Sequence, residues 1–473
     1  MKHFDLVVIG SGAGLLVLDA ALQKGLECAL IEKDAIGGTC LNRGCIPSKI
    51  LTYPADLLCQ IRRAESVGIS VSSLRVDWQK IKGRVRERQG DGAEMLAQYE
   101  KMPNFTLYAG SGQFVGDKML RVQLSAGGWS ENLTGDNIVV AAGARTFVPP
   151  IENLKETGYV SYESFFGDGF PDKPYDSVII VGGGVIGAEF SHIFSAFGGH
   201  VTLVGRASRY LKHEDEDINA QLEESFRACG IEVFTSHEAL RAEKTASGKR
   251  LYMRSLLSGE TLVKEAQEIF VAAGSLSNAD TLSPEETMLE TDDRGYIPVN
   301  EFMETNRPGI YALGDIAGKY QFRHSANYEA ETLAHNLYDA RAERRKADYR
   351  AIPWAVFSEP QIGHVGLTER QARVLYPKVY VGRKRYSSIA MGWAMGYDPG
   401  DKQGGMFKII VDEKRRILGA HAVGYQASSL VQPFAYLMNA GDGTYDPILR
   451  SMVIHPAISE LGAWCIDNIK WEE

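Results

Sequence analysis

The sequence predicts an α/β fold made of two similar α/β units, with a smaller α+β unit at the C-terminal end. The first observation is an apolar strand, a glycine-rich turn, a helix and a second strand near the N-terminus. The second observation is the return of the same series after residue 176. The third is the length of 473 residues, which suggests three domains at about 150 residues each.

Composition and charge exclude several classes of protein. Hydrophobic residues make up 44% of the chain and charged residues 23%, as in ordinary globular proteins. The net charge of −9 argues against a nucleic-acid-binding surface. No run reaches about 18 apolar residues, so we expect no membrane span. Residues 1–5 run directly into a strand, so we expect no secretory signal and predict a cytoplasmic location.

The first unit begins with residues 4–9, an apolar run typical of a buried parallel strand. The turn that follows carries three glycines, Gly10, Gly12 and Gly14. A helical pattern comes next, and then a strand over 28–31 that ends at Glu32. This order predicts a dinucleotide site in which the helix N-terminus faces a pyrophosphate and the acid binds ribose hydroxyls. The third fingerprint glycine would fall at Leu15, so we expect the helix to stand slightly farther from the strand.

The second unit repeats this order with a complete fingerprint. A strand over 177–181 leads into Gly182, Gly184 and Gly187, and the next strand covers 201–204. Buried strands ending at Gly143 and at Gly274 match each other in the two units. Two dinucleotide folds imply two nucleotides held face to face, and we interpret them as FAD and a nicotinamide coenzyme.

The cysteines Cys40 and Cys45 lie between a Gly-Gly turn and Pro47. In a regular helix, residues five apart are roughly 8–9 Å apart at Cα, whereas a disulfide needs about 4.4–6.8 Å. If the two cysteines pair, the backbone between them must be tighter than a helix, and Gly44 permits this. The alternative is two buried free thiols. No further Cys or His lies at the short spacing of a zinc site, so no metal is expected.

The remaining chain divides by composition. Pro149 and Pro150 mark one boundary and the charged stretch 341–350 marks a linker. The C-terminal unit ends with a turn over 453–460 and a helix predicted to reach the end of the chain. The expected division is a FAD-binding domain over 1–150, an NAD(P)-binding domain over 151–275, a return to the FAD-binding region over 276–346 and a dimerisation domain over 347–473.

Together, Cys40-x4-Cys45, the two glycine-rich folds, Gly314-Asp315 and His455-Pro456-x3-Glu460 resemble the pyridine nucleotide–disulfide oxidoreductases. The resemblance covers essentially the whole chain. It implies FAD, a homodimer and a two-stage redox cycle. It also implies that Cys45 faces the flavin, that Cys40 exchanges with substrate, and that Lys49 pairs with Glu189 near the flavin. His455, oriented by Glu460, would act as acid–base on the cysteines of the other subunit.

The resemblance and the motifs together propose four catalytic residues, Cys40, Cys45, His455 and Glu460. The proposed cofactor-binding residues of the first unit are Gly10, Gly12, Gly14, Glu32, Lys33, Gly38, Thr39, Lys49, Ala142, Gly143 and Asp315. Those of the second unit are Gly182, Gly184, Gly187, Glu189, Arg206, Arg209 and Gly274.

Different segments of the chain are similar to different members of this family. The stretch 41–49 is similar to dihydrolipoamide dehydrogenases, whereas 392–395 and 424–430 are similar to mycothione reductases. The first interpretation is a dihydrolipoamide dehydrogenase-like enzyme acting on a lipoyl-type or other small disulfide or dithiol, and the alternative is an NADPH-dependent mycothione reductase. A hypothesis of another class is a flavin-carrying redox sensor or structural subunit of a larger complex.

The end of the second unit's strand predicts the coenzyme. The strand over 201–204 is followed by Gly205, where an NADH-specific member would carry Glu, and then by Arg206 and Arg209. Losing the acid removes repulsion against a 2′-phosphate, and arginines offer charge-assisted hydrogen bonds to it. We therefore expect NADPH rather than NADH. The alternative is that both arginines lie on the surface without a ligand.

Overall fold

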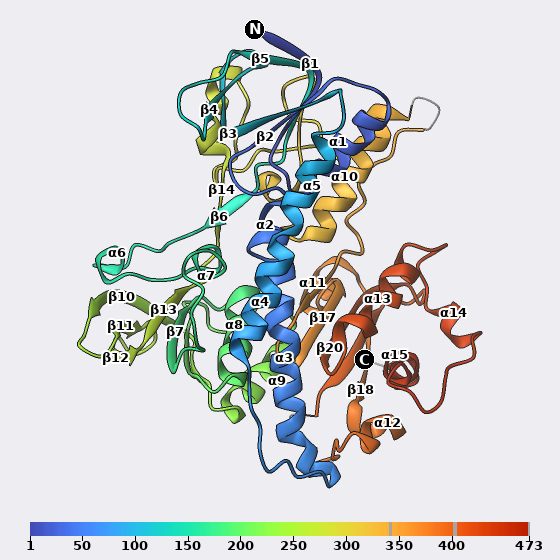
Figure 1. Cartoon of the computed structure of the whole chain (residues 1–473). Coiled ribbons are helices and arrows are strands. Elements are labelled where there is room, and N and C mark those ends of the chain that lie inside the picture. Colours follow the sequence, from blue (N-terminus) through green and yellow to red (C-terminus); the bar gives the residue numbers. More distant parts are fainter. Residues whose placement is uncertain (340–342, 401–403, 472–473) are drawn as a thin grey trace.

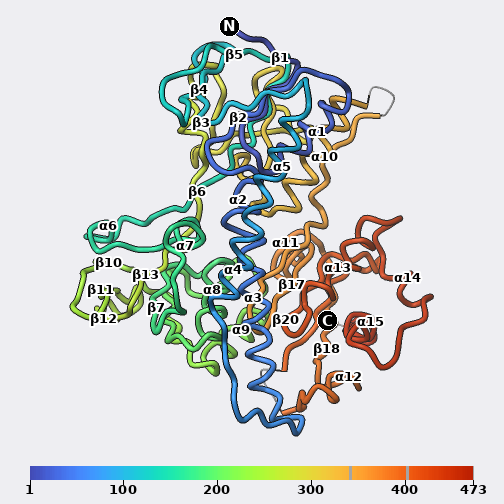
Figure 2. The backbone as a smooth tube through the Cα atoms, in the orientation of Figure 1, coloured from blue at the N-terminus to red at the C-terminus, as the bar shows by residue number. Residues whose placement is uncertain are grey.

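The computed structural model describes residues 1–339, 343–400 and 404–471. Two α/β units and a C-terminal sheet unit surround a pair of central helices, α3 (Cys45–Arg63) and α4 (Trp78–Gln89) (Figure 1). Figure 2 shows the N-terminus in the first unit, and the C-terminal end in the third. None of the described helices is both long and apolar enough to cross a membrane. The predicted fold class is confirmed.

The first unit has a parallel sheet extended by an antiparallel arch. Its strands are β1 (Lys2–Ile9), β2 (Cys28–Glu32), β3 (Phe105–Gly116), β4 (Met119–Leu124), β5 (Leu133–Val140) and β15 (Ile310–Ala312). The parallel pairings place them in the order β3-β2-β1-β5-β15. The second half of β3 pairs antiparallel with β4, and β4 pairs with β5. Because the parallel strands are buried on both faces, they are nearly continuous apolar runs.

The second unit repeats the parallel arrangement on a smaller scale. Its parallel sheet has the order β13 (Glu268–Val271), β7 (Ser177–Val181), β8 (His200–Val204) and β9 (Glu232–Phe234). An antiparallel sheet beside it contains β10 (His237–Lys244), β11 (Lys249–Ser255) and β12 (Thr261–Ala266). Where the chain enters and leaves this unit, β6 (Ala144–Thr146) pairs with β14 (Ser275–Ser277).

The third unit is a five-stranded antiparallel sheet. Its order is β16 (Pro353–Val356), β17 (Gln361–Gly366), β20 (Ile417–Gly424), β19 (Met406–Val411) and β18 (Tyr380–Arg385). Buried apolar residues of β16, β17, β19 and β20 join the core of the second unit and of α3 and α4. The second and third units therefore share one continuous hydrophobic core with α3 and α4.

Helices cover the sheets and connect them. The remaining α-helices are α1 (Gly14–Gln23), α2 (Gly38–Asn42), α5 (Asp91–Tyr99), α6 (Leu154–Thr157), α7 (Tyr162–Phe165), α8 (Val185–Ala196), α9 (Glu216–Ala228), α10 (Arg323–Tyr338), α11 (Glu369–Leu375), α12 (Ala390–Ala394), α13 (Ala427–Met438), α14 (Asp446–Leu449) and α15 (Glu460–Cys465). The 3₁₀ turns are η1 (Ala64–Val67), η2 (Ala279–Leu282), η3 (Pro284–Thr287), η4 (Gly314–Ala317), η5 (Tyr386–Ser388) and η6 (Ile466–Asn468).

Two local predictions need correction or restriction. The helix predicted to reach the chain end is shorter: α15 ends at Cys465, and between there and residue 471, the last one described, only the 3₁₀ turn η6 follows. The predicted charged linker 341–350 lies partly outside the described residues, because 341 and 342 are not described.

The close approach of α1 to its sheet occurs at Gly14. A Cβ on Gly14 would lie 2.7 Å from Cγ1 of Val8 and 3.0 Å from Cβ of Ala141. The helix therefore meets the sheet at a glycine one position earlier than the usual fingerprint. Leu15 is buried beside this contact, in the core of the first unit. The early glycine keeps the close contact that we expected Leu15 to weaken.

A buried charged cluster joins the second unit to the third. Glu214, just before α9, accepts hydrogen bonds from Nδ1 of His364 (3.0 Å) and of His421 (2.8 Å). The Nε2 atoms of the two rings lie 2.9 Å from the carbonyl oxygens of Gly366 and Leu367. Each ring therefore places both of its nitrogens against oxygen atoms.

The charges in this cluster support each other. Burial alone would lower the pKa of His421, but the Glu214 carboxylate raises it above its usual value. Burial likewise opposes the charge of Glu214, yet the two rings hold its pKa well below the usual range. Beside them, buried Lys408 pairs with Asp215 (3.1 Å) and Glu369 (2.8 Å). The cluster thus fixes the segment around residue 214 to β17, β19 and β20.

Candidate redox site

A cavity of about 1690 Å³ lies where the three units meet. It is lined by most of the predicted site residues: Gly10, Gly12, Glu32, Lys33, Gly38, Thr39, Cys40, Cys45, Lys49, Ala142, Gly143, Gly184, Glu189, Gly274 and Asp315. Gly14, Gly182, Gly187, Arg206, Arg209, His455 and Glu460 do not line it. The structure therefore brings the cysteine pair together with the ligand-facing parts of both glycine-rich turns.

The cysteine pair lies at a break between two helices. Cys40 is in α2, and Cys45 is the first residue of α3, with Pro47 in its first turn. Gly44 separates the helices, and a Cβ on it would lie 3.0 Å from the carbonyl oxygen of Thr39. This tight packing brings Cys45 back toward Cys40, so that the two thiols form a hydrogen bond. Both cysteines are free in this structure, so the disulfide between them stays a prediction.

The thiols ionise as a pair. The hydrogen bond from Cys45, together with the positive charges of Arg323 and Lys49, lowers the pKa of Cys40 to about 7, although burial opposes this shift. The same hydrogen bond and burial raise the pKa of Cys45 above its ordinary value. A thiolate is the reactive form of cysteine, so Cys40 is available as a nucleophile near neutral pH.

Lys49 is held by an acid from the second unit. Its Nζ lies 2.7 Å from Oε2 of Glu189, which is in α8. Oε1 of Glu189 accepts a hydrogen bond from the backbone N–H of Phe357 (3.0 Å), and the Lys49 ammonium lies 4.3 Å from the centre of the Phe357 ring. Glu189 is therefore satisfied by residues of the first and third units. The family resemblance implied the Lys49–Glu189 pair, whereas no local pattern in the sequence marks Phe357 as a residue of the site.

The first glycine-rich turn leaves space for a ligand at its middle glycine. Nothing lies within 4 Å of a Cβ placed on Gly12, whereas a Cβ on Gly10 would lie 2.4 Å from the carbonyl oxygen of Ala141. Glu32 holds the turn, since its Oε2 accepts from the N–H (2.7 Å) and Oγ (2.6 Å) of Ser11. Ser11 is a further residue that the sequence analysis did not select.

Several buried polar atoms on the cavity wall have no partner among the described residues. The Asp315 carboxylate has no hydrogen bond or ion pair there, and burial raises its pKa from the usual 3.8 to about 6. Oγ of Ser325 and Oδ1 of Asn327, both in α10, are likewise buried and unpaired. Unpaired buried polar groups are costly. A polar ligand with hydroxyl and amide groups, such as FAD, fits this wall.

The second glycine-rich turn has the same construction. A Cβ on Gly182 would lie 2.0 Å from the carbonyl oxygen of Ala272, and one on Gly187 would lie 2.0 Å from that of Gly182. Nothing lies within 4 Å of a Cβ on Gly184, which faces the cavity. The two outer glycines are thus required by the fold, and the middle one leaves room for a ligand.

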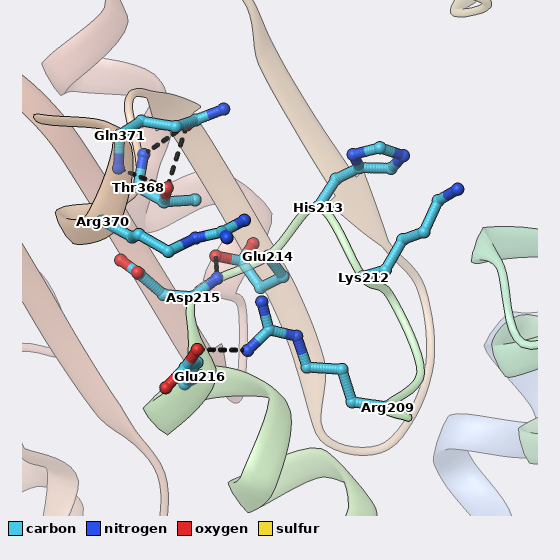
Figure 3. Close-up of a pocket in the computed structure, with 9 residues that line it drawn as sticks. All are labelled: Arg209, Lys212, His213, Glu214, Asp215, Glu216, Thr368, Arg370 and Gln371. Atoms are coloured by element: carbon cyan, nitrogen blue, oxygen red, sulfur yellow. Dashed lines mark hydrogen bonds and ion pairs between the residues drawn. The ribbon is translucent and has the colours of Figure 1, made fainter. Parts of the chain in front are cut away.

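The two predicted coenzyme arginines follow β8 outside the large cavity. Arg206 has a side chain that is 76% exposed and lies 3.4 Å from Glu238. Arg209 makes a closer ion pair, 2.7 Å, with Glu216 (Figure 3). Arg209 also lines a small separate pocket with His213 and Arg370, which shares no residue with the large cavity. Arg206 is therefore the more available of the two for an anionic ligand.

His455 and Glu460 form a pair outside the cavity of their own chain. Nδ1 of His455 is hydrogen-bonded to Oε1 of Glu460, a fully buried residue, and Oε2 of Glu460 lies 3.3 Å from the N–H of Ala457. The His455–Pro456 peptide bond is cis. The His455 side chain is 61% exposed. Four apolar side chains that precede it in the sequence are also exposed: Tyr436, Leu449, Met452 and Ile454.

Comparison with known proteins identifies the family. The model of the pyridine nucleotide-disulphide oxidoreductases matches residues 4–330, and the model of the dimerisation domain of the same family matches residues 352–465. The chain therefore belongs to the pyridine nucleotide–disulfide oxidoreductases, and it is a flavoprotein disulfide oxidoreductase. The resemblance described from the motifs is confirmed.

Relatives of known name span the whole chain. Mycothione reductase of Mycobacterium tuberculosis is 34% identical over 469 residues, with 98% of each chain covered. A dihydrolipoyl dehydrogenase of Bacillus subtilis is 31% identical over 473 residues, with 96% of each covered. The HOCl-induced flavoprotein disulfide reductase RclA of Escherichia coli has a similar structure, with a TM-score of 0.83, 26% identity, and coverage of 98% of this chain and 99% of that one.

Proposed function

We propose that this flavoprotein disulfide oxidoreductase uses NADPH to reduce a small disulfide through FAD and the Cys40–Cys45 pair. The observation that carries this proposal is the single cavity shared by the cysteine pair, the Lys49–Glu189 pair and the middle glycines of both turns. Bound FAD would accept a hydride from the coenzyme and pass two electrons to the cysteine disulfide. The predicted cytoplasmic location and the predicted domain boundaries remain part of this proposal.

The residues proposed to hold FAD are those of the first unit. Glu32 and Lys33 suit the adenosine ribose end, Gly10, Gly12, Gly14, Gly38 and Thr39 the pyrophosphate, and Asp315 with Ala142 and Gly143 the ribityl side. The unpartnered carboxylate of Asp315 supports this assignment. Gly38 supports it as well, because a Cβ there would lie 2.9 Å from Cα of Gly12 and would close the turn. In the second unit Gly182, Gly184, Gly187 and Gly274 would receive the coenzyme.

The proposed reaction of the chain's own residues is thiol–disulfide exchange. The Cys40 thiolate attacks one sulfur of the substrate, and the other half leaves as a thiolate that takes a proton from His455. Cys45 then attacks the mixed disulfide, which releases the second thiol and reforms the Cys40–Cys45 disulfide. The lowered pKa of Cys40 supports its assignment as the exchanging thiol.

Replacing the two cysteines one at a time tests this division of roles. In a Cys40→Ser variant we expect the long-wavelength absorbance between the Cys45 thiolate and the flavin to remain after reduction. In Cys45→Ser we expect it to disappear, because the flavin-facing thiolate is gone. Persistence of the band in Cys45→Ser would reverse the two assignments.

We propose that His455 acts on the cysteines of a second copy of the chain. Its exposed ring, its absence from the cavity of its own chain and the match to a dimerisation domain support a homodimer with shared sites. Mixing Cys45→Ser with His455→Ala protein should restore part of the activity, because a heterodimer has one intact site. If subunit exchange is demonstrated and activity stays absent, the sites are not shared.

The substrate is proposed to be a disulfide of the mycothione type. The support is the 34% identity to a mycothione reductase over 98% of both chains, together with the arginines that favour NADPH. A lipoyl-type substrate is the second candidate, supported by the B. subtilis dihydrolipoyl dehydrogenase. A non-catalytic flavin carrier is disfavoured by the intact Cys40, Cys45, His455 and Glu460 set.

A substrate panel decides among these functions. The purified protein should oxidise NADPH with mycothione disulfide at a kcat/KM at least about tenfold above that with lipoamide or glutathione disulfide. Rapid NAD-dependent oxidation of dihydrolipoamide would favour the second candidate instead. Absence of turnover with every disulfide and with both coenzymes would favour the flavin carrier.

A further inference from the structure

The first turn of α10 places an arginine on the wall of the redox cavity. Arg323 is the first residue of the helix and lines the same cavity as Cys40 and Cys45. Toward the described part of the chain, its guanidinium makes neither an ion pair nor a hydrogen bond. A cation facing a cavity without an anionic partner is unusual, since most arginines in this chain pair with carboxylates.

The backbone that carries Arg323 is fixed by aromatic stacking. The ring of Phe322 is stacked with that of Trp354 in β16, with centroids 6.2 Å apart and planes 5° apart. The ring of His324 is also stacked with that of Phe322, with centroids 5.4 Å apart, and its Nε2 donates to the carbonyl oxygen of Pro353 (2.6 Å). The third unit therefore holds both neighbours of Arg323. These contacts fix the backbone on both sides of Arg323, which lines the cavity.

Arg323 differs from Lys49, the other cation that lowers the pKa of Cys40, because no nearby anion among the described residues cancels its charge. Lys49 lies 2.7 Å from the Glu189 carboxylate, so much of its field is cancelled. Arg323 has no such anion. After the hydrogen bond from Cys45, Arg323 is the group that most lowers the pKa of Cys40, ahead of Lys49. Both cations also oppose the rise in the pKa of Cys45.

We propose that Arg323 is a further residue of the redox site, whose uncompensated charge stabilises the thiolate of the Cys40–Cys45 pair. The proposal deepens the proposed function, because it concerns the same two cysteines. It assigns to α10 a role in the reactivity of the thiols in addition to the ligand-facing Ser325 and Asn327.

The pH dependence of thiol labelling in the holoenzyme tests the proposal. The protein is reduced with a phosphine, treated with iodoacetamide between pH 5 and 10, and the labelling of Cys40 and Cys45 is followed by mass spectrometry. Wild-type Cys40 should label with a midpoint near pH 7. Because loss of the cation destabilises the thiolate, Arg323→Gln and Arg323→Met should raise this midpoint by about one pH unit. Arg323→Lys should keep it close to wild type.

A matched control separates position from total charge. Arg350 lines the same cavity but is paired with Asp348 at 2.7 Å, so Arg350→Gln should leave the labelling midpoint unchanged. An unchanged midpoint in both Arg323→Gln and Arg323→Met overturns the proposal, as does an equal shift in Arg350→Gln. Gln is polar and Met is apolar, so a folding defect in one variant need not occur in the other. The labelling midpoint of either folded variant is sufficient for the test.

The result is independent of the substrate assignment. Labelling requires neither coenzyme nor disulfide substrate, so a shifted midpoint supports Arg323 even where the substrate panel fails. Conversely, active disulfide reduction with an unshifted midpoint leaves the proposed function intact and removes Arg323 from the redox site.

Discussion

The two glycine-rich turns are built alike where they meet their sheets and differ where each second strand ends. Gly10 and Gly182 both have positive φ angles, and both press against a carbonyl oxygen of a neighbouring strand end. Gly12 and Gly184 both face open space. After the second strand, however, the first unit carries Glu32 and the second carries Gly205. The shared part suits a pyrophosphate, whereas the strand end distinguishes one nucleotide from another.

The largest expected effect comes from the shared part. Gly182→Ala places a Cβ 2.0 Å from the carbonyl oxygen of Ala272 at a φ of +132°, so we expect a loss of about 3 kcal/mol or more in unfolding free energy. Thermal unfolding measures this loss. Gly184→Ala is the control, because its Cβ meets no atom; it should keep the wild-type melting temperature but raise the KM for the coenzyme. A wild-type melting temperature in Gly182→Ala would show that the turn is not constrained as described.

The next effect concerns the acid of the first unit. Glu32→Ala removes the acceptor of both Ser11 donors and the proposed ribose acceptor, so we expect the Kd for FAD to rise about 100-fold. The ratio of flavin to protein absorbance after purification and dialysis measures this change. Glu27→Ala, an exposed acid just before the same strand, should retain full flavin. Equal retention in both variants would remove Glu32 from the site.

A smaller effect concerns the coenzyme arginines. The double variant Arg206→Ala/Arg209→Ala should reduce the preference for NADPH over NADH by about 10- to 100-fold, because two charge-assisted hydrogen bonds to the 2′-phosphate are lost. The ratio of kcat/KM values for the two coenzymes measures this. Since Arg209 is paired with Glu216 at 2.7 Å, Arg206→Ala alone should cause most of the change. A wild-type enzyme that prefers NADH would contradict the inference that the residues after β8 select the 2′-phosphate of NADPH.

An effect confined to one pH range concerns Asp315, which follows β15, a strand without a counterpart in the described parallel sheet of the second unit. Its pKa is raised from 3.8 to about 6, so the folded chain favours the protonated form. The stabilising contribution is therefore complete below pH 3.8 and is lost as pH rises through 6. In flavin-free protein, Asp315→Asn should raise the unfolding free energy at pH 8 by up to about 3 kcal/mol and leave it unchanged near pH 4. Equal effects at both pH values would exclude a buried carboxylate.

Much of this arrangement could be predicted because its signals are local. The glycines and apolar strands of each unit, and the acid of the first unit, lie within about 30 residues, as is usual for such a motif. Gly44 likewise predicted the tight connection between Cys40 and Cys45. The contact of Glu189 with the N–H of Phe357 joins residues 168 positions apart and involves a backbone atom, which no side-chain pattern marks. Arg323 escaped prediction for a related reason, since only the folded cavity shows that it has no partner.

Long separation in the sequence also explains why the contacts between the second and third units were not predicted. Glu214 meets His364 and His421 across 150 and 207 positions of sequence, and each residue type alone is ordinary. A lone histidine in an apolar strand predicts neither a charge nor a partner. Only the approach of the second unit to β17 and β20 brings the three together.

This buried cluster has a mechanical consequence for the working enzyme. The segment that carries Arg209 ends at Glu214, and Glu214 is clamped by two rings of the third unit. A hinge rotation of the second unit would expose or separate these charges, and breaking a buried pair costs about 3–5 kcal/mol. These contacts therefore hold the second unit in place against the third, so that the second unit does not rotate as a domain over the cavity.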